Sequence, residues 1–433
     1  FLSEEQARPA FARPLYVGRE GELAQLDTFM AGALAGEGRI IFITGGPGRG
    51  KTASLNAYAQ RAMANYSNLL VAGGKCNAYS GLGDPYLPFR EIMTMLTGDV
   101  EGRWDAGAIS REHAIRLWGA FPTAVQVLLD HGPHLLNILV PGAALLSRAV
   151  TTGYDNAPWI SQLREQVKHN RRNSREVEQG YLFRQITDVL CTVAQERPLL
   201  LILDDIQWAD AASISLLFHL GRCLADADSR LLIACAYRPE EVTVGRNGRR
   251  HPLAKVLSEF KRTFGNGWVD LGHTAKDKNR RFLDALLDME SNRLGERFRA
   301  ALFERTGGHP LFTIELLRAM QERGDLIRDT DGAWTAGPSL NWDLLPARVE
   351  AVIEERIDRL DSELRDILTI ASVEGELFTA QVVAEIRNMP ERSILNQLSQ
   401  DLERRHRLVS EIEEVETSRK RLSRYRFGHI LFQ

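Results

Sequence analysis

The feature that most constrains this chain is a glycine-rich loop that joins an apolar stretch to a stretch compatible with a helix. Ile40 to Thr44 is short, apolar and rich in β-branched residues, which predicts a buried parallel strand. A helix is predicted from Ala53 to Ala64. The loop between them matches the pattern G-x-x-x-x-G-K-S/T, whose fixed positions are Gly45, Gly50, Lys51 and Thr52.

The spacing of this loop suits a polyphosphate ligand. Glycines let backbone N–H groups approach phosphate oxygens without a clash of Cβ atoms, and the N-terminus of the next helix adds unpaired N–H groups and a positive dipole end. We predict that Lys51 reaches the β- and γ-phosphates and that the Thr52 hydroxyl binds Mg²⁺. An incidental glycine-rich turn is the alternative, and the complete pattern argues against it. The predicted nucleotide-binding residues here are Gly45, Gly46, Pro47, Gly48, Arg49, Gly50, Lys51, Thr52 and Ala53.

A pair of carboxylates follows a second apolar run. Leu199 to Leu203 predicts another buried strand, and it ends in Asp204 and Asp205. Beside a phosphate-binding loop, the first Asp of such a pair accepts hydrogen bonds from the water shell of the metal, and a second acidic group orients or deprotonates the attacking water. We therefore predict Asp204 and Thr52 at the metal. Asp205 is the predicted catalytic base, with Lys51 as a catalytic cation.

The strand signal recurs and alternates with helical patterns. Further strand candidates are Leu69–Ala72, Leu231–Tyr237 and Trp268–Leu271. This alternation predicts an α/β fold with a doubly wound parallel sheet, whose ligands bind at the carboxyl ends of the strands. Arg238 follows one of these strands, where an arginine can sense a γ-phosphate; a surface salt bridge is the alternative. Asp210 is either the N-cap of a helix or a site residue, and the sequence leaves both open.

Four segments are predicted from these patterns. They are a linker at residues 1–14, a P-loop nucleotide-binding domain at 15–272, a helical lid domain at 273–340 and a winged-helix domain at 341–433. Within the first domain, residues 89–150 are mostly helical in pattern, with breaks near Pro122, Pro133 and Pro141.

The last two segments carry little strand signal. Gly307 and Gly308 are expected to end one amphipathic helix, and Pro310 to stand in the first turn of the next. Beyond residue 346, further helices are expected at roughly 362–373, 379–386 and 391–405. A hairpin that pairs 407–411 with 424–427 would close the outline of a winged helix.

Composition excludes several classes. A net charge of −3 gives no field that favours nucleic acid or an anionic membrane. Four widely separated cysteines suggest neither a zinc site nor a disulfide framework, so we expect a cytoplasmic location. The longest apolar stretch, Leu135 to Ala149, is interrupted by Pro141 and is too short to cross a bilayer. The chain begins with Phe1 and stops at Gln433 inside a predicted helix, so we expect a fragment of a longer protein.

Several motifs stand in one order along nearly the whole chain. They are Val17-Gly18-Arg19-Glu20, the loop at 45–52, Asp204-Asp205 with Trp208-Ala209-Asp210, Arg238-Pro239, Gly308-His309-Pro310 and Phe427-Gly428-His429. This order resembles the STAND class of AAA-like P-loop ATPases. It is most similar to the bacterial branch that includes maltose-regulator-like and LuxR-type large regulators and NLR-like proteins.

The resemblance implies roles for the matching residues. Val17, Gly18 and Arg19 look like the segment that cradles adenine, and Arg238 looks like the sensor arginine. Pro310 looks like the lid proline that packs on adenine. His429 is similar to the winged-helix histidine that binds the ADP β-phosphate, although Ile430 stands where the family usually has Asp. The implied cofactors are ATP or ADP and Mg²⁺.

The resemblance also implies a function. We expect a signal-transduction switch with slow ATP hydrolysis, which passes from an ADP-locked closed monomer to an ATP-bound open oligomer. Sensor repeats and an effector would lie outside these 433 residues. The main alternative is a DNA-binding, initiator-like ATPase that uses the winged helix; a scaffold without turnover and a metabolic kinase or GTPase are further alternatives. The trigger, the effector, the oligomer size and the bound nucleotide are left open, as is the choice between Asp205 and Asp210 for the water.

Overall fold

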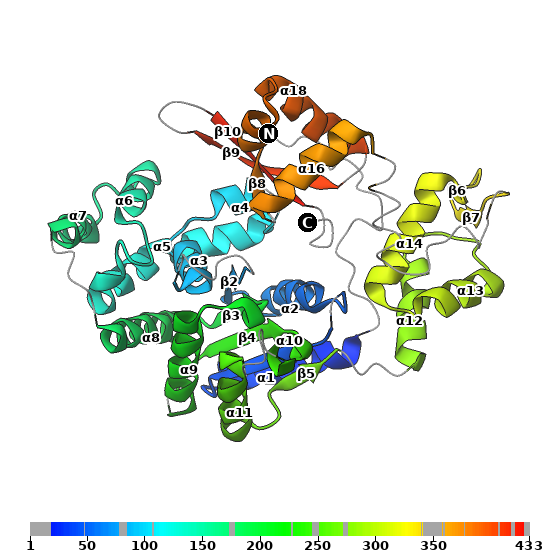
Figure 1. The fold of residues 1–433 in the computed structure, drawn as a ribbon. Coiled ribbons are helices and arrows are strands. Elements are labelled where there is room, and N and C mark those ends of the chain that lie inside the picture. Colours follow the sequence, from blue (N-terminus) through cyan, green and yellow to red (C-terminus); the bar gives the residue numbers. More distant parts are fainter. Residues whose placement is uncertain are drawn as a thin grey trace. The chain divides into compact units, whose positions relative to one another are not determined.

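The computed structural model describes residues 19–46, 48–77, 85–105, 108–172, 178–226, 228–244, 251–271, 276–338, 340, 357, 360–375, 377–405, 408–416 and 421–427. The chain divides into two compact units. One comprises residues 12–100 and 111–282, and the other comprises 1–11, 101–110 and 283–433. The division falls inside helix α12 (Lys276–Leu287), and Figure 1 gives the elements of both units. The predicted domain boundaries stay a prediction.

A five-stranded parallel sheet organises the first unit. Its strands are β1 (Arg39–Thr44), β2 (Leu70–Lys75), β3 (Leu199–Asp204), β4 (Leu231–Tyr237) and β5 (Trp268–Asp270). They lie in the order β2-β3-β4-β1-β5, and every pair is parallel. Each predicted strand is therefore present. The predicted doubly wound α/β fold is confirmed.

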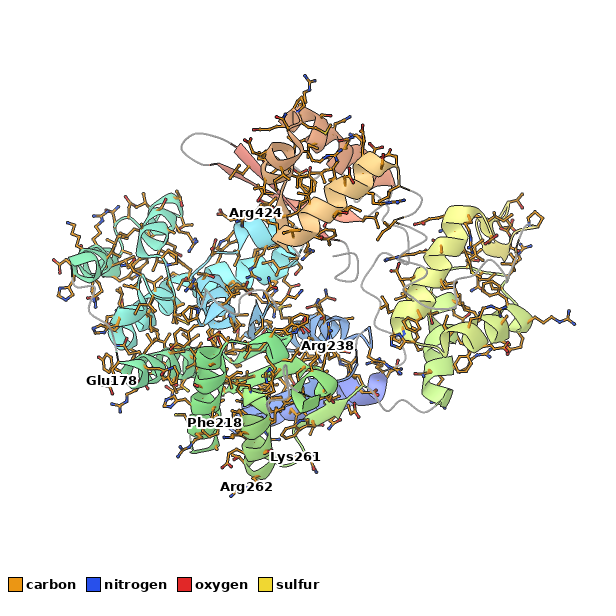
Figure 2. The ribbon with its side chains drawn as sticks, in the orientation of Figure 1. Glu178, Phe218, Arg238, Lys261, Arg262 and Arg424 are labelled. Carbon is orange, nitrogen blue, oxygen red and sulfur yellow. The ribbon has the colours of Figure 1, made fainter. Side chains whose placement is uncertain are left out.

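Helices cover both faces of this sheet because alternate side chains of each strand point to opposite faces. On one face, Ile41 and Ile43 of β1 join a buried cluster with residues of α1 (Glu20–Leu34) and α2 (Lys51–Asn65). On the other, the Phe42 ring stacks on Phe260 of α11 (Pro252–Phe264), with ring centroids 5.8 Å apart. Phe218 of α9 (Ala211–Asp226), labelled in Figure 2, packs on the same Phe260 ring.

The connection from β2 to β3 is long and helical. It contains α3 (Leu87–Leu96), α4 (Glu101–Asp105), α5 (Arg111–His131), the 3-10 helix η2 (Pro133–Leu135), α6 (Gly142–Thr151), α7 (Pro158–Arg172) and α8 (Gln179–Glu196). Helices end near Pro133 and Pro141 as predicted, but the break predicted near Pro122 is wrong, because Pro122 lies inside α5. Buried side chains before and after it, such as Phe121 and Val125, hold the helix against the core across the proline.

The second unit contains the C-terminal end of α12, followed by the helices α13 (Glu296–Thr306) and α14 (Pro310–Arg323). Gly307, at φ 58°, ends α13 and Pro310 opens α14, as the sequence predicts. After these helices comes a short hairpin of β6 (Leu326–Arg328) and β7 (Trp334–Ala336), which the sequence did not indicate. The Arg328 guanidinium lies 4.6 Å from the centre of the Trp334 ring and stabilises this short hairpin.

The C-terminal part of this unit has the element order of a winged helix. Its elements are α16 (Ser362–Glu374), β8 (Leu377–Thr379), α17 (Ala380–Arg387), α18 (Glu391–Asn396), the π-helix η6 (Gln397–Arg405), β9 (Val409–Glu416) and β10 (Arg421–Phe427). The strands form an antiparallel sheet in the order β8-β10-β9 over an apolar core that includes Ile367, Phe378 and Tyr425. The predicted helices and the predicted hairpin are present. Among the described helices, none is long and apolar enough to cross a membrane.

Candidate functional site

The glycine-rich loop leaves β1 and enters α2 through a left-handed glycine. Gly50 is the N-cap of α2 and has a left-handed backbone with φ 83°, which residues other than glycine rarely adopt. The first N–H groups of α2 have no partner within the helix and are oriented toward its N-terminus. Gly45, Gly46, Gly48, Arg49 and Ala53 lie in or beside this turn, while Pro47 lies outside the described residues.

Lys51 places a buried ammonium group over this loop. Lys51 is 6% exposed, and its Nζ donates to the carbonyl oxygens of Gly45 at 2.8 Å and Gly46 at 3.2 Å. A cation at the centre of a loop that ends in a helix N-terminus is a complementary setting for an anionic phosphate chain. These residues therefore fit the nucleotide that the motif predicts.

Thr52 and Asp204 meet at the end of β3. The Thr52 hydroxyl donates to Asp204 Oδ2 at 2.6 Å, so the structure brings the two predicted metal residues together. Burial raises the pKa of Asp204, the neighbouring Asp205 charge raises it further, and the bond from Thr52 acts in the opposite direction. Mg²⁺ usually takes one or two protein oxygens besides water and phosphate. A threonine hydroxyl and a carboxylate are oxygen ligands of this kind, so Thr52 and Asp204 fit Mg²⁺.

Asp205 adopts a conformation that is uncommon for a residue with a side chain. Its φ is 54°, which costs roughly 1–2 kcal/mol relative to ordinary backbone. Its N–H donates to Asp204 Oδ1 at 3.0 Å, and its Oδ1 accepts from Gln207 Nε2 at 2.9 Å. The 3-10 helix η3 (Ile206–Trp208) begins directly after it. The predicted base is thus held by neighbours on both sides.

Asp210 has a structural partner of its own. One of its carboxylate oxygens accepts the Ser213 N–H at 2.9 Å, and the other accepts the Ser213 hydroxyl. This is the arrangement of an N-cap residue before α9. This geometry matches the N-cap role, which is one of the two roles that the sequence left open for Asp210.

Arg238 reaches the same end of the sheet. It follows β4, whose last residue, Tyr237, lies opposite Thr44 of β1. Its guanidinium donates to Glu241 of α10 (Pro239–Val244) at 2.9 Å and lies 4.8 Å from the centre of the Trp208 ring. The Trp208 indole N–H donates to the other oxygen of Glu241 at 2.8 Å. Figure 2 labels Arg238. This ion pair is of the kind that the sequence left open as the alternative for Arg238, although Glu241 was not named as its partner.

Arg19 connects the segment before α1 to the loop. Arg19 is 8% exposed, and its Nη2 donates to the Arg49 carbonyl oxygen at 2.5 Å. Val17 and Gly18 lie outside the described residues. Pro310 belongs to the second compact unit, at the start of α14, and His429 also lies outside the described residues.

Gln207 is a second residue that sequence reasoning missed. Its side chain joins Asp205 to the backbone of Arg238, because Oε1 accepts the Arg238 N–H at 3.1 Å. An amide inside a turn has no charge or periodicity to mark it. Its position two residues after the paired carboxylates is the one signal that the sequence offers.

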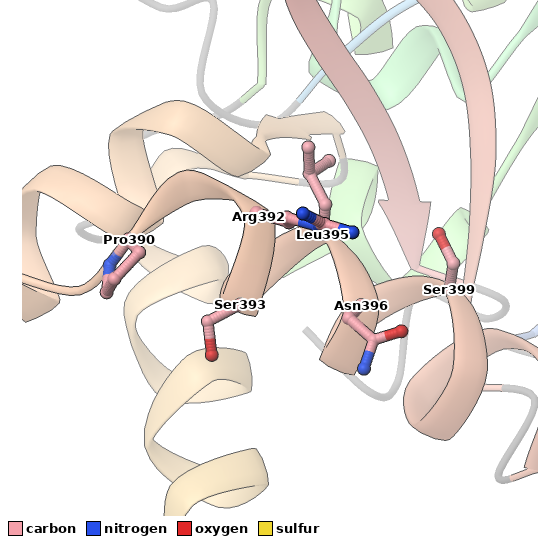
Figure 3. A pocket seen from close by; sticks show the side chains of 6 residues that line it. All are labelled: Pro390, Arg392, Ser393, Leu395, Asn396 and Ser399. Atoms are coloured by element: carbon pink, nitrogen blue, oxygen red, sulfur yellow. The ribbon is translucent and has the colours of Figure 1, made fainter.

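A separate cavity of about 690 Å³ opens on the winged-helix region (Figure 3). It is lined by Pro390, Arg392, Ser393, Leu395, Asn396 and Ser399. None of the predicted site residues lines it, and Arg392 is the one charged residue among those that do. This cavity therefore does not involve the loop before α2, which is the predicted phosphate site.

A family model described as the AAA ATPase domain matches residues 16–233, which is just over half of the 433-residue chain. The chain belongs to the AAA ATPase domain family. It is therefore a P-loop ATPase that binds and hydrolyses ATP, and the glycine-rich loop, Asp204 and the strands β1, β2 and β3 fall within the matched region. A comparison with curated proteins found no match.

Solved structures that are similar to this chain include the following three. The Orc1 protein of Aeropyrum pernix, solved in complex with DNA, is 16% identical, with 97% of this chain and 91% of that one covered at a TM-score of 0.37. Cdc6p of Pyrobaculum aerophilum is 13% identical over 98% and 95%, at a TM-score of 0.40. A signal transduction ATPase with numerous domains (STAND) and a tetratricopeptide repeat sensor, from Pyrococcus horikoshii, is 16% identical. The match covers 96% of this chain and 42% of that one, at a TM-score of 0.40. Likenesses at this level are too weak to assign a function.

Proposed function

We propose that this ATPase is a nucleotide-operated signalling switch whose hydrolysis is slow. The observation that carries the proposal is the engagement of Arg238 by Glu241 and Trp208 at the phosphate end of the sheet. An arginine held there by specific partners has two alternatives: it keeps these partners, or it exchanges them for a γ-phosphate. The Arg238 Nε is buried and has no acceptor among the described residues, so its present partners leave it incompletely satisfied.

The chemistry of the site follows from its own side chains. Lys51 and the N-terminus of α2 bind the phosphate chain, and Thr52 with Asp204 would hold Mg²⁺, which neutralises charge on the phosphate oxygens. Asp205 accepts a hydrogen bond from the attacking water through Oδ2, since Oδ1 is taken by Gln207. Arg19 fixes the segment that is proposed to carry the adenine contacts of Val17 and Gly18.

The energies required of such a switch are within reach of a few contacts. Changing a population from 1:99 to 99:1 takes about 5.5 kcal/mol of differential binding. A hydrogen bond to a charged group contributes about 1.5–3 kcal/mol. Two or three such bonds are enough, and Lys51, Arg238 and His429 are the proposed donors.

In the proposed cycle, ADP stabilises a closed monomer and ATP an open, oligomerising form. Pro310, on adenine, and His429, on the β-phosphate, would join the second unit to the nucleotide. Sensor repeats after residue 433 and an effector before residue 1 would supply the signal and the output. The free thiols of Cys76, Cys191, Cys223 and Cys235 suit the reducing cytoplasm that we propose as its location.

The nucleotide released by denaturing the purified chain tests this proposal, together with the mass of the native chain in solution. Stoichiometric ADP with a monomeric mass, and a larger assembly after exchange for ATP, are the expected results. Identical masses with ADP and with ATP at saturating concentration would overturn the switch and leave a plain ATPase.

A DNA-binding role through the winged helix is the alternative function, and the charge balance of the chain argues against it. The chain carries 54 Lys and Arg residues against 57 Asp and Glu residues, which gives a net charge of −3. This balance supplies no general positive field of the kind that binding to a phosphate backbone requires. Duplex binding that weakens steeply with added salt would favour this alternative.

A further inference from the structure

We propose that Gln207 is a positioning residue for hydrolysis, which orients Asp205 and joins it to Arg238. The inference rests on the proposed role of Asp205 as the base. It concerns a side chain at which neither charge nor a general motif pointed to catalysis. Gln207 is 3% exposed and uses both ends of its amide on groups of the site.

The orientation of the amide is determined by its partners. Nε2 donates to Asp205 Oδ1 at 2.9 Å, where a carboxylate requires a donor, and Oε1 accepts the Arg238 N–H at 3.1 Å, where an N–H requires an acceptor. A flipped amide would satisfy neither group. The backbone of Gln207 is fixed as well, because its carbonyl oxygen lies 2.9 Å from His251 Nε2.

His251 has one protonation pattern that suits its two contacts. Its Nδ1 accepts the Leu253 N–H at 3.2 Å at the start of α11, so the proton of the neutral ring belongs on Nε2 and points to the Gln207 carbonyl. Gln207 is therefore held from α11 while it holds the ends of β3 and β4. A side chain that only closed a turn would not need its long-range contact with the Arg238 N–H.

The consequence for Asp205 is a distinction between its two oxygens. Gln207 occupies Oδ1, whereas Oδ2 has no hydrogen-bond partner within the described part of the chain. With φ at 54°, the backbone of Asp205 also needs neighbours that maintain its conformation. The Gln207 amide provides such a neighbour and leaves one defined oxygen for water. The same amide links the other oxygen of Asp205, Oδ1, to the backbone N–H of Arg238, so a movement of Arg238 is transmitted to the base.

The test is the pH dependence of ATP hydrolysis by Gln207→Glu. A protonated carboxyl has the shape of the amide, and it too can donate to Asp205 and accept from Arg238. Once ionised, it has no hydrogen to donate and sets a second negative charge against Asp205. Burial and nearby carboxylates raise the pKa of such a group. Within the described residues, the charged or titratable side chains at this end of the sheet include Asp204, Asp205, Asp210, Asp270, Glu241, Lys51, Lys75, Cys76, Tyr237, Arg238 and His251.

We expect Gln207→Glu to hydrolyse ATP as the parent does at about pH 5 and to lose at least about tenfold in kcat toward about pH 9. The affinity for ATP should change little, because the substitution leaves Lys51 and Thr52 untouched. Gln126→Glu is the matched control: Gln126 also donates to a carboxylate, Asp130, but on an exposed face of α5. Its pH profile should follow the parent.

Two other results would overturn the inference. A Gln207→Glu profile parallel to the parent would show that the amide does not orient the base, and an equal loss at every pH would indicate a purely structural role. Asp205→Asn, measured alongside, separates this failure from that of the proposed function. If Asp205→Asn hydrolyses ATP like the parent, the base is wrong. If it loses turnover while Gln207→Glu follows the parent, the positioning role alone is wrong.

Discussion

Lys51 is the residue whose loss should affect the nucleotide most directly. Its buried ammonium group lies against the carbonyls of Gly45 and Gly46, in the position from which it would bind phosphate. Charge-assisted hydrogen bonds are worth about 1.5–3 kcal/mol each. Lys51→Ala should therefore weaken ATP binding by at least about tenfold to a hundredfold in titration calorimetry. Lys255→Ala, at an exposed lysine of α11, should have no effect, and tight binding by the Lys51 variant would refute the site.

Asp204 gives a prediction about stability because its environment opposes its charge. Burial and the Asp205 charge raise its pKa above that of an unfolded Asp. The folded state therefore loses stability as pH rises through that raised pKa. Asp204→Asn keeps a partner for the Asp205 N–H and for Thr52, without the charge. At neutral pH and without nucleotide it should unfold at a higher temperature, by roughly 2–4 °C for each kcal/mol relieved.

Calorimetric scans at two pH values check this prediction. The gain of Asp204→Asn should vanish below about pH 4, where the carboxyl is protonated in both states. Asp130→Asn, at an exposed carboxylate, should show no such pH-dependent gain. If Asp204→Asn melts below the parent at neutral pH, the buried charge is already compensated in the folded state.

For single residues, the sequence predicted those contacts that a known motif brings together. Thr52 and Asp204 are 152 positions apart, and their contact was predictable because strand–loop–helix motifs bring such residues to one sheet edge. For Arg238 the sequence left a salt bridge open as the alternative to a γ-phosphate contact, and the ion pair with Glu241 is such a salt bridge. The stacking of its guanidinium on Trp208 was not predicted, because it depends on geometry that the sequence spacing does not specify.

Among the elements, buried parallel strands were the easiest to predict, since continuous apolar runs such as Leu231 to Tyr237 have few other uses. The β6–β7 hairpin was missed because each strand has three residues and depends on tertiary contacts such as Trp334 with Glu290. Pro122 was misjudged for a related reason. Its helix is maintained by packing that a local rule about proline does not include.

The contact of β2 with α3 gives a prediction that belongs to these elements. A Cβ atom at Gly74 would lie 2.0 Å from the Pro88 carbonyl oxygen, and backbone at the start of a helix has little room to yield. Gly74→Ala should lower the free energy of unfolding by about 1–3 kcal/mol, as overpacking usually does. Gly73→Ala is the control within the same strand, because its nearest neighbour would be Ile202 at an ordinary 3.8 Å. Equal melting temperatures for the two variants would contradict this view of the β2–α3 contact.

For the whole molecule, the central question is whether one nucleotide couples both compact units. Four of the proposed nucleotide and metal contacts, Lys51, Thr52, Asp204 and Asp205, lie in the first unit. Pro310 lies in the second unit, at the first turn of α14. If Pro310 also contacts the nucleotide, binding in the core and the state of the second unit are linked, and each must change the other by the same free energy.

Pro310→Ala tests that linkage. Alanine suits the start of a helix, and the bond from the Thr313 N–H to the His309 carbonyl does not involve residue 310, so α14 should persist. Each buried CH₂ group contributes about 0.8 kcal/mol, so losing the ring should weaken ADP binding by about tenfold. ADP should also protect α14 from hydrogen exchange in the parent and less so in the variant. Pro158→Ala, at the exposed proline that opens α7, should leave both measurements unchanged. Unchanged ADP affinity in Pro310→Ala, with α14 intact, would mean that the core binds nucleotide alone and that any switch acts through Arg238.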